Sequence, residues 1–210
     1  MDTDPHPMRN RVTPLGDIVA IGLRGAWLGN RGNLHRGREI VRYTRNRAWI
    51  TCALHYKNWT IPQWAPGHYT VLFFHDEAVA LAAGHRPCAL CRRAAYNDFR
   101  TTSVVGTGHP VPGAVDLDRQ LHGERLIAGT HRRRLHTFDW SALPDGAFVV
   151  LTGQPHLVLR EAVIPWTTDG YAAPLSRPSA GTAQALTPPT SIRALAAGYP
   201  VQIDSVRASA

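Results

Sequence analysis

Two cysteines three residues apart constrain the fold of this chain more than any other feature. Cys88 and Cys91 follow a glycine and a proline within residues 84–93. In a Cys-x-x-Cys turn both thiolates point into one pocket, and the first turn of a following helix favours negative charge. The spacing therefore predicts half of a tetrahedral zinc site. A redox dithiol has the same spacing, but a βαβ context is typical of it.

Cys52 is the remaining cysteine and the predicted third ligand, because zinc in closed sites prefers sulfur. It lies in residues 48–56, where alternating polarity predicts a strand with Cys52 on the apolar face. The alternative is a small buried side chain without a ligand role. The fourth ligand is a histidine, a carboxylate or water, and we favour His35 because a loop residue has freedom to reach the site. Three other histidines remain open as alternatives: His55, His75 and His85.

The residues around the Cys-x-x-Cys turn are similar to a known zinc domain. A Phe-Phe pair at 73–74, an Ala-rich segment at 77–83 and Gly-His-Arg-Pro-Cys-Ala-Leu-Cys-Arg at 84–92 follow one another. This stretch resembles the second half of the zinc-binding domain of Ada-type DNA methylphosphotriester repair proteins, within an uncharacterised bacterial family. The resemblance implies a zinc fold and a role in DNA repair or processing. The family's upstream Cys-x-x-x-Cys pair, which includes its methyl-accepting cysteine, is absent, and His85 replaces an aromatic residue.

Arginine dominates the charge of the chain, whose formal net charge is +8. Basic residues crowd into two segments, residues 24–57 with Glu39 as their only acid, and residues 130–136. Such density raises the local concentration of phosphates, so we expect DNA or RNA binding with little sequence preference. The alternative is a solvated surface. The predicted nucleic-acid-binding side chains are Arg31, Arg45, Arg47, Arg92, Arg93, Arg132 and Arg133.

The patterns of apolar residues predict an α+β fold. Residues 1–14 are expected to be a mobile arm, and residues 15–105 a small mixed or antiparallel sheet with helices around the zinc site. A Gly- and Pro-rich linker at 106–113 precedes a C-terminal α+β appendage, residues 114–210, with a β-meander and a short helix. Strands are predicted at 17–21, 39–43, 48–56, 69–74, 148–151, 156–160 and 165–171, and a loop at 177–183. Helices are predicted at 76–83, 89–100, 116–126 and 190–197. The aromatic residues expected in the core are Trp49, Trp59, Trp64, Phe73 and Phe74.

The sequence contains no candidate membrane segment. No run reaches the roughly 18 apolar residues of a membrane span and no signal peptide is visible, so we expect a cytoplasmic protein without a membrane partner.

Two functions agree with these patterns. The first function is a zinc-binding, nucleic-acid-interacting protein of Ada-like type. The second is a zinc-dependent enzyme acting on a small or nucleotide-like substrate, with His85, Asp76 or Glu77 moving protons. A closed zinc site favours the first function and an open site favours the second.

Overall fold

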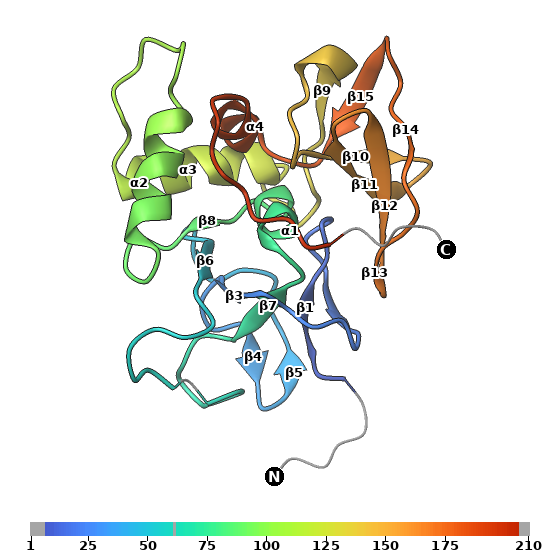
Figure 1. Ribbon diagram of the computed structural model, residues 1–210. Helices are drawn as coiled ribbons and strands as arrows, with labels where there is room; N and C mark the ends of the chain where they lie inside the picture. The colour runs from blue at the N-terminus through green and yellow to red at the C-terminus, as the bar shows by residue number, and fades with distance from the viewer. Residues whose placement is uncertain (1–6, 61, 206–210) are drawn as a thin grey trace.

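Two large β-sheets and four α-helices make up the computed structural model, which describes residues 7–60 and 62–205 (Figure 1). The helices are α1 (Glu77–Ala82), α2 (Arg93–Thr102), α3 (Ala114–Arg125) and α4 (Pro189–Ala196). Helix α1 contacts β7 of one sheet and β10 of the other, and Figure 1 shows it between the two sheets. The predicted α+β class is therefore confirmed, and each helix begins within a few residues of its predicted start.

The first sheet is mixed, as predicted, and has the strand order β2-β1-β7-β3-β6-β8. Its strands are β1 (Arg9–Val12), β2 (Ile18–Ala20), β3 (Trp27–Asn30), β6 (Ile50–Cys52), β7 (Leu72–Phe74) and β8 (Arg86–Pro87). Strand β1 runs parallel to β7, and β6 runs parallel to β8. The centre of the sheet requires glycine at position 29, because a Cβ there would lie 2.5 Å from the Phe74 ring. A separate hairpin joins β4 (His35–Arg36) and β5 (Glu39–Ile40).

Two predictions in this half are wrong. The predicted mobile arm, residues 1–14, includes β1, which pairs with β2 and β7 and buries Val12 in the core. Residues 1–6 of that arm lie outside the described residues. The predicted pairing of 39–43 with 48–56 does not occur, because β5 pairs with β4 while β6 pairs with β3 and β8. Alternation identified these segments as extended, but it did not identify their partners.

The second sheet contains the predicted β-meander, formed by β10, β11 and β12 in antiparallel register. Its strands are β9 (His136–Asp139), β10 (Phe148–Leu151), β11 (Gln154–Leu159), β12 (Ala162–Thr167), β13 (Gly170–Tyr171), β14 (Leu175–Ser176) and β15 (Thr182–Ala185). A short 3₁₀ helix, Trp140–Ala142, follows β9. Strand β15 begins at Thr182, within the predicted loop 177–183, and it pairs with both β10 and β9.

Both hydrophobic cores combine residues from either side of the predicted linker at 106–113. In one core Tyr96 and Phe99 of α2 pack with residues of α3, α4 and the second sheet. In the other core Phe74 and α1 pack with Phe148 and other residues of the second sheet. The predicted domain boundary is thus bridged by shared apolar packing. No helix within the described part of the chain has the length and apolar character of a membrane span.

Candidate metal centre and adjoining pocket

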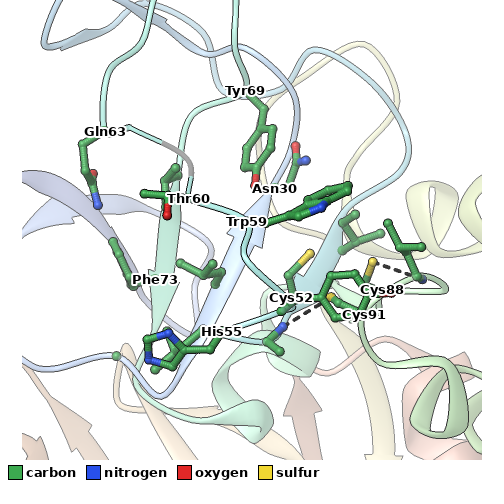
Figure 2. Close-up of a pocket in the computed structure, with 18 of the residues that line it drawn as sticks. Asn30, Cys52, His55, Trp59, Thr60, Gln63, Tyr69, Phe73, Cys88 and Cys91 are labelled. Atoms are coloured by element: carbon green, nitrogen blue, oxygen red, sulfur yellow. Dashed lines mark hydrogen bonds between the residues drawn. The ribbon is translucent and has the colours of Figure 1, made fainter.

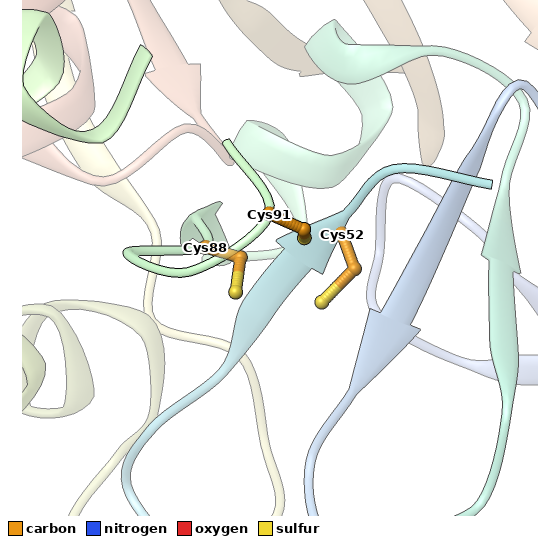
Figure 3. A group of neighbouring side chains, drawn as sticks. All are labelled: Cys52, Cys88 and Cys91. Atoms are coloured by element: carbon orange, nitrogen blue, oxygen red, sulfur yellow. The ribbon is translucent and has the colours of Figure 1, made fainter. Parts of the chain in front are cut away.

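Strands β6 and β8 bring the three cysteines together. Their parallel register pairs Thr51 with Pro87, and the Cys88 backbone N–H donates to Thr51 O at 2.9 Å. Cys52 ends β6, Cys88 directly follows β8, and the turn after Cys88 returns Cys91 to the same side. All three Sγ atoms lie within 4.8 Å of one another (Figure 3). The predicted meeting of Cys52 with the Cys-x-x-Cys pair is therefore present.

The three sulfur atoms suit a zinc ion. Tetrahedral coordination with Zn–S distances of about 2.3 Å places sulfurs roughly 3.8 Å apart, which is compatible with the observed cluster. Two backbone N–H groups also point at sulfur, one from Leu90 to Cys88 Sγ and one from Ala53 to Cys91 Sγ, each at 3.4 Å (Figure 2). Hydrogen bonds of this kind favour the anionic form that a metal requires. The cluster is a candidate metal site.

The protonation states of the three thiols depend on one another. A hydrogen bond from the Cys52 thiol lowers the pKa of Cys88, and the backbone N–H of Leu90 lowers it further against the effect of burial. The same hydrogen bond and burial raise the pKa of Cys52, while burial raises the pKa of Cys91. Cys88 is therefore the first thiolate to form. A metal ion that binds all three sulfurs displaces the remaining protons, so its affinity rises with pH.

The cysteines line a pocket of about 740 Å³, a size typical of small-ligand sites (Figure 2). Its aromatic lining consists of Tyr56, Trp59, Tyr69 and Phe73. Its polar lining includes Asn30, His55, Thr60 and Gln63, and its guanidinium groups are those of Arg11 and Arg24. No carboxylate side chain is found among the described residues that line it. The pocket therefore presents apolar surface, hydrogen-bonding groups and positive charge next to the three thiols.

The structure corrects the choice of His35 as the fourth ligand. The His35 ring belongs to a different set of contacts, with Nδ1 at 2.7 Å from Thr70 Oγ1 and Nε2 at 3.3 Å from Ala65 O. The edge of the ring also packs against Trp64 at 5.5 Å. These partners are distant in the sequence, and they hold the His35 ring away from the three cysteines.

The other three candidate histidines also lie outside the cysteine cluster. His75 Nε2 is 2.9 Å from Asp204 Oδ2, and His85 Nε2 accepts a hydrogen bond from Arg31 Nε at 3.1 Å. His55 lines the pocket, but Figure 2 shows its ring pointing away from the three sulfur atoms. Within the described residues the cluster thus has three protein ligands, and its open side faces the pocket.

Two of the residues expected to move protons are used in packing. Asp76 caps α1 by accepting from the Val79 N–H, and its other oxygen accepts from the Tyr171 hydroxyl at 2.7 Å. Glu77 pairs with Arg92 at 2.6 Å, with both side chains almost completely buried. The third expected residue, His85, is buried among aromatic rings and guanidinium groups. None of the three lines the pocket.

His55 and Tyr69 line the pocket, and neither is among the residues predicted from the sequence to move protons. The sequence predicts His55 as an alternative metal ligand and Tyr69 as part of a strand. Burial and the nearby thiols raise the pKa of Tyr69 to about 12, so its hydroxyl stays protonated at neutral pH. Trp59 was predicted in the core, yet it is 62% exposed at the pocket. The sequence contains a signal for this exposure, because Trp59 lies in a Pro-containing segment without helical or strand periodicity, which is typical of a surface loop.

Arg31 is an interior residue, and this contradicts its predicted contact with nucleic acid. Its side chain is fully buried, with Nη1 donating to Gly16 O at 3.0 Å and Nε donating to His85. The guanidinium lies 3.9 Å from the ring centroid of Trp49, and Arg125 approaches the same ring at 4.1 Å. The arginines stabilise the core through cation–π contacts with a buried aromatic ring.

Arg92 and Arg133 are also engaged inside the protein. Arg92 pairs with Glu77 and lies over the Trp27 ring at 3.8 Å. Arg133 donates to the carbonyl oxygens of Ala82, Ala83 and Leu186, and burial lowers its pKa to about 10. Each guanidinium thus has internal partners, which leaves fewer of its donors for the predicted nucleic-acid contact.

The other four predicted arginines are exposed: Arg45, Arg47, Arg93 and Arg132. The two basic segments meet, since the Tyr43 and His131 rings are 5.3 Å apart. A hollow of about 290 Å³ at this junction is lined by Arg47 and Arg134, among others. The two basic segments, which are distant in the sequence, thus lie side by side.

The chain matches no described protein family, no curated protein and no solved structure. The resemblance to the Ada-type zinc domain therefore rests on the sequence motif and stays a prediction.

Proposed function

We propose that the protein is a zinc-dependent enzyme acting on a small or nucleotide-like substrate. The observation that supports this proposal is the position of the three sulfurs in the wall of the pocket, with no described histidine or carboxylate completing the ligand set. Three protein ligands and one open position are typical of catalytic zinc, whereas structural zinc has four protein ligands. When bound by Cys52, Cys88 and Cys91, zinc would supply Lewis acidity to a ligand in the pocket.

The residues of the chain have distinct tasks in this proposal. The backbone N–H groups of Leu90 and Ala53 stabilise the thiolates, and the buried Arg92–Glu77 pair holds the chain directly after Cys91. A ligand that covers the apolar walls would displace water from them, which would strengthen electrostatic interactions in the pocket. His55 supplies an imidazole to the lining, and imidazole is the side chain most often used as a general acid or base.

Metal analysis tests the ligand set. We expect about one zinc per chain in the purified protein and none in the Cys88→Ser/Cys91→Ser variant, since structural and catalytic zinc sites both need these thiolates. Cys52→Ser should lose part of the zinc. His35→Gln is the control, and it should retain all of it. Full zinc content and unchanged thermal stability in the double variant would refute the site.

Cobalt substitution tests whether the metal has an open position. Co²⁺ takes the same tetrahedral thiolate coordination as zinc and has a visible spectrum that depends on its ligands. Addition of azide should change this spectrum if the fourth position faces the pocket. An unchanged spectrum would indicate a closed site, and it would favour a structural metal over an enzyme.

Nucleic-acid binding is the second candidate function, and the junction of the two basic segments supports it. The exposed side chains Arg45, Arg47 and Arg132 lie on segments that the Tyr43–His131 contact joins. The resemblance to Ada-type proteins implies DNA as the partner, in repair or processing. Arginine contacts to phosphates give affinity that falls steeply with salt.

Fluorescence anisotropy with a labelled DNA duplex at two salt concentrations tests this second function. Arg47→Gln/Arg132→Gln should weaken binding and reduce the slope of log affinity against log salt by roughly 2, since each lost phosphate contact removes about 0.9. Arg119→Gln, which changes an exposed arginine of α3 paired with Asp116, is the matched control. Absence of binding at low salt would exclude the function.

A further inference from the structure

We infer that the pocket beside the three cysteines binds a flat nitrogen heterocycle that carries an anionic group, as a nucleoside monophosphate does. This inference rests on the proposed function, because it names the class of ligand for that site. Three properties of the lining support it: exposed aromatic surface, amide groups oriented as donors, and arginine charge without lining carboxylates.

Exposed apolar side chains at the pocket favour a flat ring. Leu54, Trp59 and Leu90 line the pocket, and they are 36%, 62% and 51% exposed. The Tyr56 ring meets Trp59 edge-on at 5.9 Å and 82°, which holds the indole from one side. An aromatic ligand stacked on Trp59 would cover apolar surface that now contacts water.

Two amide side chains of the pocket are set to donate hydrogen bonds. Asn30 Oδ1 accepts from the Gly32 N–H at 2.7 Å, and Gln63 Oε1 accepts from Asn10 Nδ2 at 3.0 Å. Each oxygen thus already accepts one hydrogen bond, and the NH₂ group supplies two donors that a ligand could use. Ring nitrogens and exocyclic carbonyl oxygens of a heterocycle are acceptors that match these donors. A hydrocarbon ligand would leave them unpaired, which is costly.

Positive charge in the lining favours an anionic group on the ligand. The Arg11 guanidinium lies 4.7 Å from the Phe73 ring centroid, Nε donates to Leu23 O at 2.8 Å, and Nη1 donates to Asn10. These contacts hold the guanidinium in place at the pocket wall before any ligand binds. Arg24 adds a second, exposed cation. A phosphate or carboxylate would compensate charges that no described lining carboxylate neutralises.

Calorimetric titration of the zinc-loaded full chain tests the inference with AMP and UMP as probes. The matching nucleosides carry the ring without the anion, and inorganic phosphate carries the anion without the ring. We expect at least one monophosphate to bind about tenfold or more tightly than its nucleoside and than phosphate, since ring and anion contribute separately. The inference is overturned if neither monophosphate binds more tightly than phosphate.

Variants locate the binding. Trp59→Ala should weaken the monophosphate about tenfold through lost stacking, and Arg24→Gln should weaken it to a similar extent without weakening the nucleoside. Arg24 is exposed, so its substitution leaves the fold intact. Arg119→Gln on α3 is the control and should bind as the unaltered protein does. Unchanged affinity for the monophosphate in both pocket variants would show that the ligand binds elsewhere, and it would refute the inference.

The two proposals fail in distinguishable ways. Bound zinc and an azide-sensitive cobalt spectrum, together with no monophosphate binding, would remove this inference and leave the proposed function standing. Monophosphate binding that is unchanged in Cys88→Ser/Cys91→Ser, in a protein that holds no zinc, would keep the ligand class and remove the zinc-dependent function.

Discussion

Replacing His85 with phenylalanine should remove part of the decrease in the free energy of unfolding that the protein shows as the pH falls. His85 is fully buried, with its ring 4.6 Å from Phe74 and 5.0 Å from Trp49. Burial lowers the pKa of His85 well below its ordinary value, and the neighbouring guanidiniums, Arg31 foremost, lower it further. The folded protein therefore holds a neutral imidazole, whose Nε2 accepts from Arg31 Nε at 3.1 Å.

The sign of the pH effect follows from the lowered pKa. In the unfolded chain a histidine titrates near pH ~6.5, so below this pH the unfolded state binds a proton that the folded state does not. The free energy of unfolding then falls by up to about 1.4 kcal/mol for each pH unit below ~6.5. Between pH 6.5 and pH 5 His85 should cost the fold roughly 2 kcal/mol, whereas above pH 6.5 its contribution is constant.

The variant His85→Phe has no imidazole to protonate, but it leaves Arg31 Nε without its acceptor. At pH 8 it should be less stable than the unaltered protein by about 1–3 kcal/mol, the cost of an unpaired buried donor. At pH 5 this difference should have shrunk by roughly 2 kcal/mol, because the unaltered protein has lost stability that the variant keeps.

Urea unfolding followed by circular dichroism at pH 8, 6.5 and 5, with saturating zinc, measures both differences. His109→Phe replaces an exposed histidine and should show no such change with pH. A difference between His85→Phe and the unaltered protein that is the same at all three pH values would refute the reasoning.

Three further substitutions test the interior by urea unfolding at neutral pH. Trp49→Ala should cost about 3–5 kcal/mol, because it opens a cavity and removes the ring between buried side chains; a cost below about 1 kcal/mol would contradict this role. Gly84→Ala should cost at least about 1–2 kcal/mol, since φ is +84° and the new Cβ would lie 2.6 Å from Arg125 Cδ, and an unchanged midpoint would show that the loop relaxes freely. Arg92→Gln should cost about 3–5 kcal/mol by leaving Glu77 buried without its cation, whereas the exposed neighbour variant Arg93→Gln should be nearly neutral.

The sequence predicts those features of the fold that depend on residues close together along the chain. The Cys-x-x-Cys turn, the helices and the β-meander each depend on residues that are close along the chain, such as Asp76 as the cap of α1. The choice of Cys52 as a partner of Cys88 and Cys91 came from the preference of zinc for sulfur, and the parallel pairing of β6 with β8 places it there.

Whether an individual arginine is buried or exposed depends on partners that are far away in the sequence. Arg31 and Arg47 look alike in the sequence, yet one is fully buried and the other is exposed. The difference is set by Gly16 and His85, whose acceptor atoms take hydrogen bonds from Arg31 Nη1 and Nε. Burying a charged group is tolerated only where such acceptors are assembled, and periodicity carries no information about them.

The sequence by itself supplied the chemistry of the candidate metal site, since its three cysteines offer soft sulfur ligands. Only the tertiary structure decided that the three thiols lie in the wall of a pocket, with no described histidine or carboxylate among them. It removed His35 through the contact with Thr70, and it folded the segment that holds Trp59 and Gln63 over the thiols to form a pocket. The physical reason is that residue type sets which bonds a side chain can make, whereas long-range packing decides which of those bonds are already satisfied.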